Sequence, residues 1–287
     1  MGNENKFVYP ATGLRGAAAN ALVNCRPLLR TRRALLSRLP FLELASDVVN
    51  VVYCTWVVDV ANVAHLVPPG VALSQREGKA LFTILTYAHR HFGPRIAGPL
   101  RRLFPSPLQS NWRLYVDTFP GGTGSSSSST VLFVKNVFDH PLYAIGTRLF
   151  SDALPSHLAQ RFEHTVSEGR FHTILSGGGG SAPDFRCDTV SAIERALPTS
   201  LKPFFDSWRS AVTFLCLQHG AIAYVEDGAR LAHARIDLPI DIDTVQALEP
   251  VGSLVGGDFL ERIGAVDQPF CFVVPKVAFR VLSERLI

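Results

Sequence analysis

The chain has 287 residues, which is long for one domain, although large β-rich folds often reach this length as a single unit. Hydrophobic residues make up 47% of it and charged residues 18%, so the material for a core is ample and a disordered chain is excluded. The net charge is only +4, and the N-terminal block of arginines in residues 11–40 lacks the interleaved aromatic residues of a nucleic-acid platform. We therefore expect no nucleic-acid partner.

The N-terminal 40 residues are predicted to be a basic, helical extension. Residues 11–40 hold six arginines and no acidic residue, and Ala17–Leu39 has helical character before Pro40 breaks it. Such a segment could be a targeting peptide, a membrane-surface helix or a solvated helix that precedes the domain. We favour the solvated helix, because Pro27 interrupts the periodicity, and we assign residues 41–287 to one domain.

The remaining chain is predicted to be rich in strands. Strand composition marks Phe41–Val60, Lys79–His91 and Phe270–Leu282, and Ala211–Val225 also has the pattern of a long apolar strand. Short helices are expected at Pro141–Arg148, Asp188–Leu197, Leu201–Trp208, Asp241–Leu248 and Gly257–Ile263. Two segments rich in Gly and Ser, residues 121–129 and 176–181, lie between strand-like stretches and fit hairpin connections. This order favours an antiparallel or mixed β-rich α+β architecture.

Five cysteines, at positions 25, 54, 187, 216 and 271, form no Cys-x-x-Cys pair, which is typical of a reducing compartment. No apolar stretch is long enough to span a bilayer, since Val48–Val60 is broken by Asn50 and Asp59. We therefore expect a cytoplasmic protein without stable membrane insertion. Composition leaves open whether it forms a homo-oligomer.

The stretch Pro105–Val116 is the one place where polar side chains alternate inside a strand pattern. Gln109, Asn111, Arg113 and Tyr115 share one face, because successive side chains of a strand point to opposite sides. Two interpretations fit this polar row. It belongs to an edge strand and lies in water, or it lines a polar cavity in which Arg113 anchors an anion.

Searches for established catalytic motifs find none. The sequence has no Gly-x-Ser-x-Gly elbow, no His-Glu-x-x-His, no paired cysteine ligands and no phosphate-loop lysine. His89-x-His91 has a usable metal-ligand spacing on a strand, but no third ligand can be named. We therefore predict no metal and no cofactor.

Several short motifs in their order along the chain resemble the acetoacetate decarboxylase superfamily, and more closely its uncharacterised YqjF-like branch. They are Thr55-Trp-Val-Val58, Leu66-Val-Pro-Pro-Gly70, Asn111-x-Arg113-x-Tyr115-Val116, Ala144-Ile-Gly-Thr-Arg148 and Leu154-Pro155, and the resemblance covers roughly residues 41–287. It implies a cone-shaped β-barrel of mixed or antiparallel strands with short flanking helices, enclosing a small-molecule cavity. It also implies that the polar row faces the barrel interior.

The resemblance does not imply decarboxylation. The decarboxylases use a Schiff-base lysine, whereas Ser156 and His157 stand here where lysines would follow Pro155. Gln109 is the nearest counterpart of their strand glutamate, and an amide cannot act as a general acid or base. Lys135, at the end of an apolar run, is the lysine that could point into the cavity instead.

Two functions remain open from the sequence. The first is a lyase-like or isomerase-like enzyme that acts on a carboxylate or carbonyl compound by acid/base chemistry without a Schiff base. In it Tyr115, His157 or His89 would transfer protons, and an anionic ligand would contact Arg113, Asn111, Gln109, Arg148 and Lys135. The second is a non-catalytic binding or accessory protein with the same cavity. A third interpretation makes Arg113 a buried structural partner that holds strands together.

Overall fold

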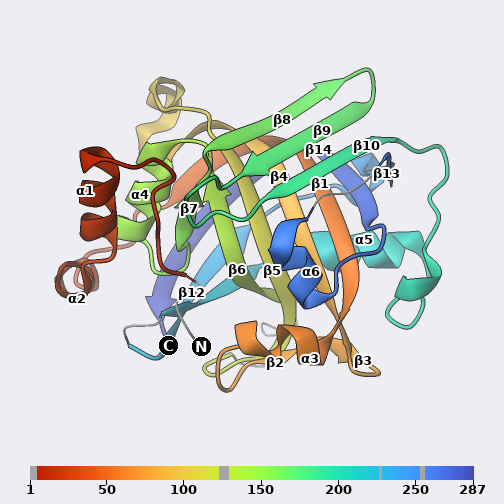
Figure 1. Cartoon of the computed structure of the whole chain (residues 1–287), viewed down its shortest axis with the longest axis horizontal. Coiled ribbons are helices and arrows are strands. Elements are labelled where there is room, and N and C mark those ends of the chain that lie inside the picture. Colours follow the sequence, from red (N-terminus) through yellow and green to blue (C-terminus); the bar gives the residue numbers. More distant parts are fainter. Residues whose placement is uncertain (1–4, 123–128, 226–227, 253–255) are drawn as a thin grey trace.

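The computed structural model describes residues 5–122, 129–225, 228–252 and 256–287 (Figure 1). Seven strands form a closed barrel in the order β1-β4-β5-β6-β11-β12-β14, and β14 pairs with β1 to complete the ring. All neighbours in the ring are antiparallel except β6 and β11, which are parallel. The barrel strands are β1 (Leu44–Asp59), β4 (Lys79–Pro94), β5 (Leu108–Thr118), β6 (Thr130–Phe138), β11 (Gly220–Val225), β12 (Arg230–Asp237) and β14 (Phe270–Leu286).

A second layer continues the same sheet and packs on the outside of the barrel. It leaves the first half of β14 in the order β13-β10-β9-β8 and passes in front of β4 and β5 (Figure 1). Its strands are β8 (Arg161–Ser167), β9 (Arg170–Ser176), β10 (Phe185–Ser191) and β13 (Gln246–Pro250), and the short strands are β2 (Ala72–Leu73), β3 (Gln75–Arg76) and β7 (Ser156–Leu158). Phe185 of β10 packs edge-on against both Trp56 and Trp112, which joins this outer layer to the barrel wall.

The two faces of the barrel wall differ in burial. One face is buried on every strand of the ring and includes Tyr53, Tyr115 and Ala221, whereas the opposite face carries the exposed Arg90, Arg235 and Lys276. The first face is therefore the interior. Strand β5 lies between β4 and β6 in the ring, so the interpretation of the polar row as a solvated edge strand is wrong.

Helices cover the ends and the outer side of the barrel. In Figure 1, α4 lies to the left of the barrel, α5 to its right and α6 in front of β5. The helices are α1 (Leu14–Val23), α2 (Arg26–Leu36), α3 (Val60–Val63), α4 (Pro141–Phe150), α5 (Trp208–Cys216) and α6 (Gly257–Ile263), with 3-10 turns at η1 (Ala64–Leu66), η2 (Arg95–Leu103), η4 (Thr199–Leu201) and η5 (Ile242–Thr244). No helix in the described part of the chain has the length and apolar character needed to cross a bilayer.

The N-terminal segment is helical as predicted, and most residues of its two helices are exposed, although a few of its side chains contact the rest of the chain. Asp152, which follows α4, accepts hydrogen bonds from the guanidinium groups of Arg32 and Arg33 at 2.7 and 2.9 Å. Phe7 and Val23 are fully buried in a cluster with α4. The arginines of α2 are therefore partly occupied by structural ion pairs, and the division of the chain at residue 41 stays a prediction.

The structure confirms the predicted β-rich α+β fold with a mixed barrel, but four predicted elements are wrong. Leu201–Trp208 is not a helix, because α5 begins only at Trp208. Asp241–Leu248 is not a helix, because it holds the 3-10 turn η5 and the start of strand β13. Asp188–Leu197 is not a helix, because its first residues continue strand β10. Ala211–Val225 is not one strand, because it divides into helix α5 and strand β11. The hairpin connection predicted at residues 176–181 joins β9 to β10. The other predicted connection, residues 121–129, lies between β5 and β6, and its residues 123–128 lie outside the described residues.

Candidate functional site

Arg113 and Tyr115 lie in the barrel interior, where they contact the end of helix α5. Arg113 Nη2 donates to the carbonyl oxygen of Leu215 at 2.6 Å and to the Tyr115 hydroxyl at 3.2 Å. Its guanidinium also lies 5.3–5.5 Å from the ring centres of Tyr53 and Tyr115. Leu215 belongs to the last turn of α5, where carbonyl groups lack helical partners and carry partial negative charge. The helix end thus compensates the buried cation.

The charge of Arg113 has no carboxylate partner among the described residues, and its Nε is buried without a hydrogen-bond acceptor. Burial raises the pKa of Tyr115, so its hydroxyl stays protonated at neutral pH. That hydroxyl lies 3.2 Å from Thr83 Oγ1 and 3.3 Å from the Leu215 carbonyl oxygen. Arg113 and Tyr115 therefore both form hydrogen bonds with groups of the protein itself inside the barrel.

His89, Gln109 and Asn111 form a separate chain of hydrogen bonds in the interior. His89 Nδ1 lies 2.9 Å from Ser46 Oγ, and its Nε2 lies 2.7 Å from Gln109 Oε1. Asn136 Oδ1 accepts from Asn111 Nδ2 at 2.6 Å and from Gln109 Nε2 at 3.4 Å. Because Gln109 presents its oxygen, His89 Nε2 carries the proton. Burial lowers the pKa of His89 to about 4, so the ring is neutral at neutral pH.

Arg148 and His157 lie together near the N-terminal segment, far along the chain from the polar row. Arg148 of α4 donates to the backbone carbonyls of Ser156 and Asn5, and its guanidinium covers the ring of Phe7 at 5.3 Å. Its Nη2 also approaches His157 Nε2 at 3.5 Å. An arginine can only donate, so His157 Nε2 is the acceptor and Nδ1–H donates to Ser181 Oγ at 2.7 Å.

The environment of His157 makes it a poor base. Burial, and then the positive charges of Arg148 and Lys135, hold its pKa well below the usual range. The Ser181 hydroxyl that it contacts also accepts from the backbone N–H of Val8 at 2.9 Å. His157 therefore positions Ser181 and, through it, the N-terminal segment.

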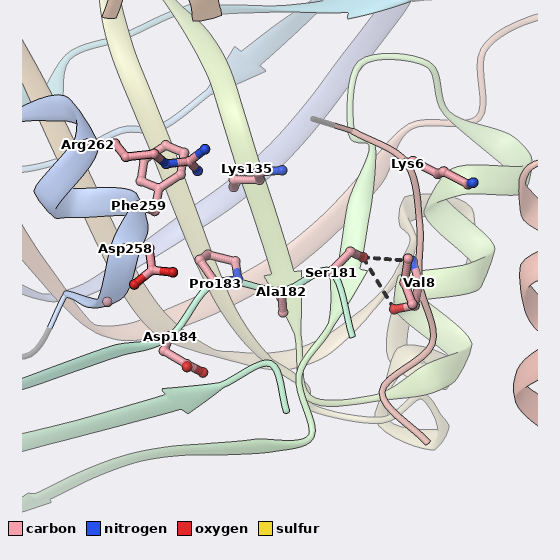
Figure 2. A pocket seen from close by; sticks show the side chains of 11 residues that line it. Lys6, Val8, Lys135, Ser181, Ala182, Pro183, Asp184, Asp258, Phe259 and Arg262 are labelled. Carbon is pink, nitrogen blue, oxygen red and sulfur yellow. Dashed lines mark hydrogen bonds between the residues drawn. The ribbon is translucent and has the colours of Figure 1, made fainter. Parts of the chain in front are cut away.

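Lys135 lines a cavity of about 630 Å³ that lies between β6, α6 and the N-terminal segment. The lysine is only 6% exposed, on the outer face of β6 opposite Trp112. The cavity is lined by Lys6, Val8, Lys135, Ser181, Ala182, Pro183, Asp184, Gly257, Asp258, Phe259 and Arg262. Figure 2 shows the Lys135 amine between α6 and Ser181, with Arg262 and Asp258 contributed by the helix and Lys6 pointing away. It is a pocket with a buried amine at its base and charges of both signs at its rim.

The eight residues selected from the sequence thus fall into three groups. Arg113 and Tyr115 contact α5, while His89, Gln109 and Asn111 form the amide chain, and neither group lines this cavity. Arg148, His157 and Lys135 form the third group at or behind the cavity. Sequence reasoning missed Ser181, Asp258 and Arg262. The segment 176–181 ending in Ser181 was recognised only as a hairpin connection, and the α6 residues carry no motif.

Comparisons with known proteins agree with this fold. The model of the DUF2071 family, described as an uncharacterized conserved protein, matches residues 47–226. No curated protein matches the chain.

Among solved structures, the enduracididine biosynthesis enzyme MppR, complexed with the condensation product of pyruvate and imidazole 4-carboxaldehyde, is 15% identical with a TM-score of 0.55, over 85% of this chain and 88% of that chain. An acetoacetate decarboxylase-like enzyme from Sphingomonas wittichii RW1 is 11% identical with a TM-score of 0.54, over 86% of this chain and 94% of that chain. The acetoacetate decarboxylase of Legionella pneumophila is 13% identical with a TM-score of 0.50, over 85% and 86%. These likenesses confirm the predicted acetoacetate decarboxylase-like fold.

Proposed function

The chain belongs to the DUF2071 family and has an acetoacetate decarboxylase-like fold, and from this premise we propose that it is an enzyme acting on a small 2-oxo or 3-oxo acid in the Lys135 cavity. The observation that carries the proposal is the buried amine of Lys135 at the base of a cavity of about 630 Å³. MppR, which has a related fold, is seen with a condensation product of pyruvate. Pyruvate itself has both a carbonyl and a carboxylate.

The proposed chemistry is proton transfer next to a polarised carbonyl. Lys135 would donate to the carbonyl oxygen and stabilise the enolate that forms when the neighbouring carbon loses a proton. Arg262, at the rim, would hold the substrate carboxylate, and Asp258 beside it would accept the proton. This assignment moves the acid/base role from Tyr115, His89 and His157 to residues that line the cavity, and it gives His157 a positioning role.

The experiment follows exchange of the pyruvate methyl protons for deuterium in D₂O by NMR. We expect the wild-type chain to catalyse exchange and Lys135→Met to lose about 100-fold or more of the rate, which is the usual loss for a positioned acid/base or electrostatic group. Lys79→Met is the matched control, because Lys79 is exposed and pairs with Asp59. Lys135→Arg, which keeps the charge, tests whether folding rather than chemistry is affected.

The same samples treated with borohydride test the alternative chemistry. Proton transfer without an imine predicts no pyruvate adduct, whereas a covalent adduct on Lys135 would mean that this lysine forms a Schiff base. Exchange that persists in Lys135→Met would contradict the proposed site.

A binding protein without catalysis is the second candidate, and one observation favours it. Gln109 and His157, which stand where the resemblance places the decarboxylase carboxylate and lysine, are both held in internal hydrogen bonds. This function predicts that pyruvate raises the melting temperature increasingly with its concentration and that no proton exchange follows.

A further inference from the structure

Three of the five cysteines meet between the barrel wall and the outer layer. Cys54 on β1 and Cys271 on β14 are direct cross-strand neighbours, and Cys187 on β10 lies against them. Residues separated by 133 and 217 positions in the chain are thereby brought together. All three are free thiols, and all are buried among apolar residues such as Val52 and Val273.

The spacing of the sulfur atoms suits a common metal ligand set. Cys54 Sγ lies 3.7 Å from both Cys187 Sγ and Cys271 Sγ, and all three atoms lie within 4.8 Å of one another. A metal ion about 2.3 Å from each of three sulfurs would place them about 3.8 to 4.0 Å apart. The three thiols could therefore bind one ion with only small side-chain movements.

The ligand set also narrows the class of ion. Three thiolates are soft ligands that select Cu⁺ and Zn²⁺ over hard cations. Within the described residues no histidine, carboxylate or fourth cysteine joins the group, and structural Zn²⁺ almost always takes four ligands. A three-sulfur site without a fourth ligand therefore fits Cu⁺ better than Zn²⁺.

We propose that Cys54, Cys187 and Cys271 form a three-sulfur site for a single soft metal ion, with Cu⁺ as the best-fitting ion. Binding would displace thiol protons and would clamp the outer layer onto the barrel through β10. The three-sulfur site is separate from the Lys135 cavity, because none of the three cysteines lines that cavity.

The test is refolding of the full-length reduced chain with one equivalent of Cu⁺ under anaerobic conditions, followed by desalting against a competing chelator. Refolding is used because the buried thiols are not open to solvent in the native chain. We expect about one retained ion per chain, with X-ray absorption showing three sulfur neighbours and no nitrogen. A parallel sample with Zn²⁺ identifies the ion, and Zn²⁺ held by the same three sulfurs would support the site while overturning the choice of Cu⁺.

Matched variants separate the cluster from other thiols. Cys187→Ser should weaken retention at least tenfold, whereas Cys216→Ser, buried on the inner face, and Cys25→Ser should retain the ion. If Cys187→Ser fails to fold, Cys187→Ala takes its place. Retention of the ion by either Cys187 variant, a nitrogen or oxygen ligand set, or no retained metal in the folded wild-type chain would each overturn the proposal.

Discussion

Arg113 illustrates how a residue that looks like a ligand anchor can serve the fold. The sequence places it correctly on the inner face of a polar row, but Arg148, which the sequence predicts to contact the same ligand, instead contacts Asn5 and Ser156 near the N-terminal segment. The partner of Arg113 is a helix end, which alternation within one strand cannot reveal. A buried cation held by a backbone carbonyl and two aromatic rings is compensated without any ligand.

This structural role can be measured with Arg113→Met. The variant leaves the Leu215 carbonyl and the Tyr115 hydroxyl without their donor, and we expect the free energy of unfolding to fall by about 2–4 kcal/mol. Arg280→Met is the control, because Arg280 forms an exposed pair with Asp237 and should cost less than about 1 kcal/mol. Urea unfolding of both variants gives the comparison. An unchanged stability of Arg113→Met, together with weaker pyruvate binding, would restore the anchor interpretation.

His89 makes the stability of the fold depend on pH. Its pKa is about 4 in the folded chain, because burial disfavours the charged ring, and about 6.5 when unfolded. The unfolded state therefore binds the proton first. Stability from the neutral ring is fully present above about pH 6.5 and is lost as the pH falls toward 4, by roughly 3 kcal/mol in total.

The matching experiment is urea unfolding at several pH values between 4 and 7 for the wild type and His89→Gln. We expect the variant to be less stable at pH 7 but to lose less stability on acidification. Some slope should remain, because burial also lowers the pKa of His157 and His164. His65→Gln, at an exposed position, is the control. Equal slopes for wild type and His89→Gln would show that this ring is not the titrating group.

At the scale of elements, the sequence predicts most strands but misses helix α5, whose last turn contacts Arg113 and Tyr115 in the barrel interior. The run from Ala211 to Val225 is apolar apart from Thr213, Gln218 and His219, and a mostly apolar run of this kind shows no clear helical or strand period. The distinguishing signal is local. Ser207 and Ser210 form a capping box that begins α5, and the polar Gln218 and His219 follow its end.

The polar row was predictable as a face but not as a site. Period-two alternation places Gln109, Asn111, Arg113 and Tyr115 together, and the resemblance correctly turns that face inward. Which residues meet a cavity depends instead on segments far apart in the chain, since Lys135, Ser181 and Arg262 come from β6, a hairpin and α6. No spacing in the sequence connects them.

At the scale of the whole molecule, the N-terminal segment makes specific contacts with the rest of the chain. Ser181 N donates to Val8 O at 3.1 Å, Arg148 holds Asn5, and Phe7 is fully buried. Lys6 and Val8 also form one wall of the Lys135 cavity. Residues from both sides of residue 41 therefore contribute to one hydrophobic cluster and to the proposed site, and the domain boundary at residue 41 stays a prediction.

A chain of residues 41–287 tests this integration. Loss of buried Phe7 and Val23 should each cost about 1.5–3 kcal/mol, so we expect the free energy of unfolding to fall by about 4 kcal/mol or more. The open cavity should also lose pyruvate-dependent deuterium exchange. Leu14→Ser in the full chain is the control, because Leu14 is exposed and its change should leave both quantities unaltered. If residues 41–287 unfold at the same urea concentration and exchange at the same rate as the full chain, the boundary at residue 41 is a true domain boundary and the N-terminal wall contributes nothing to the site.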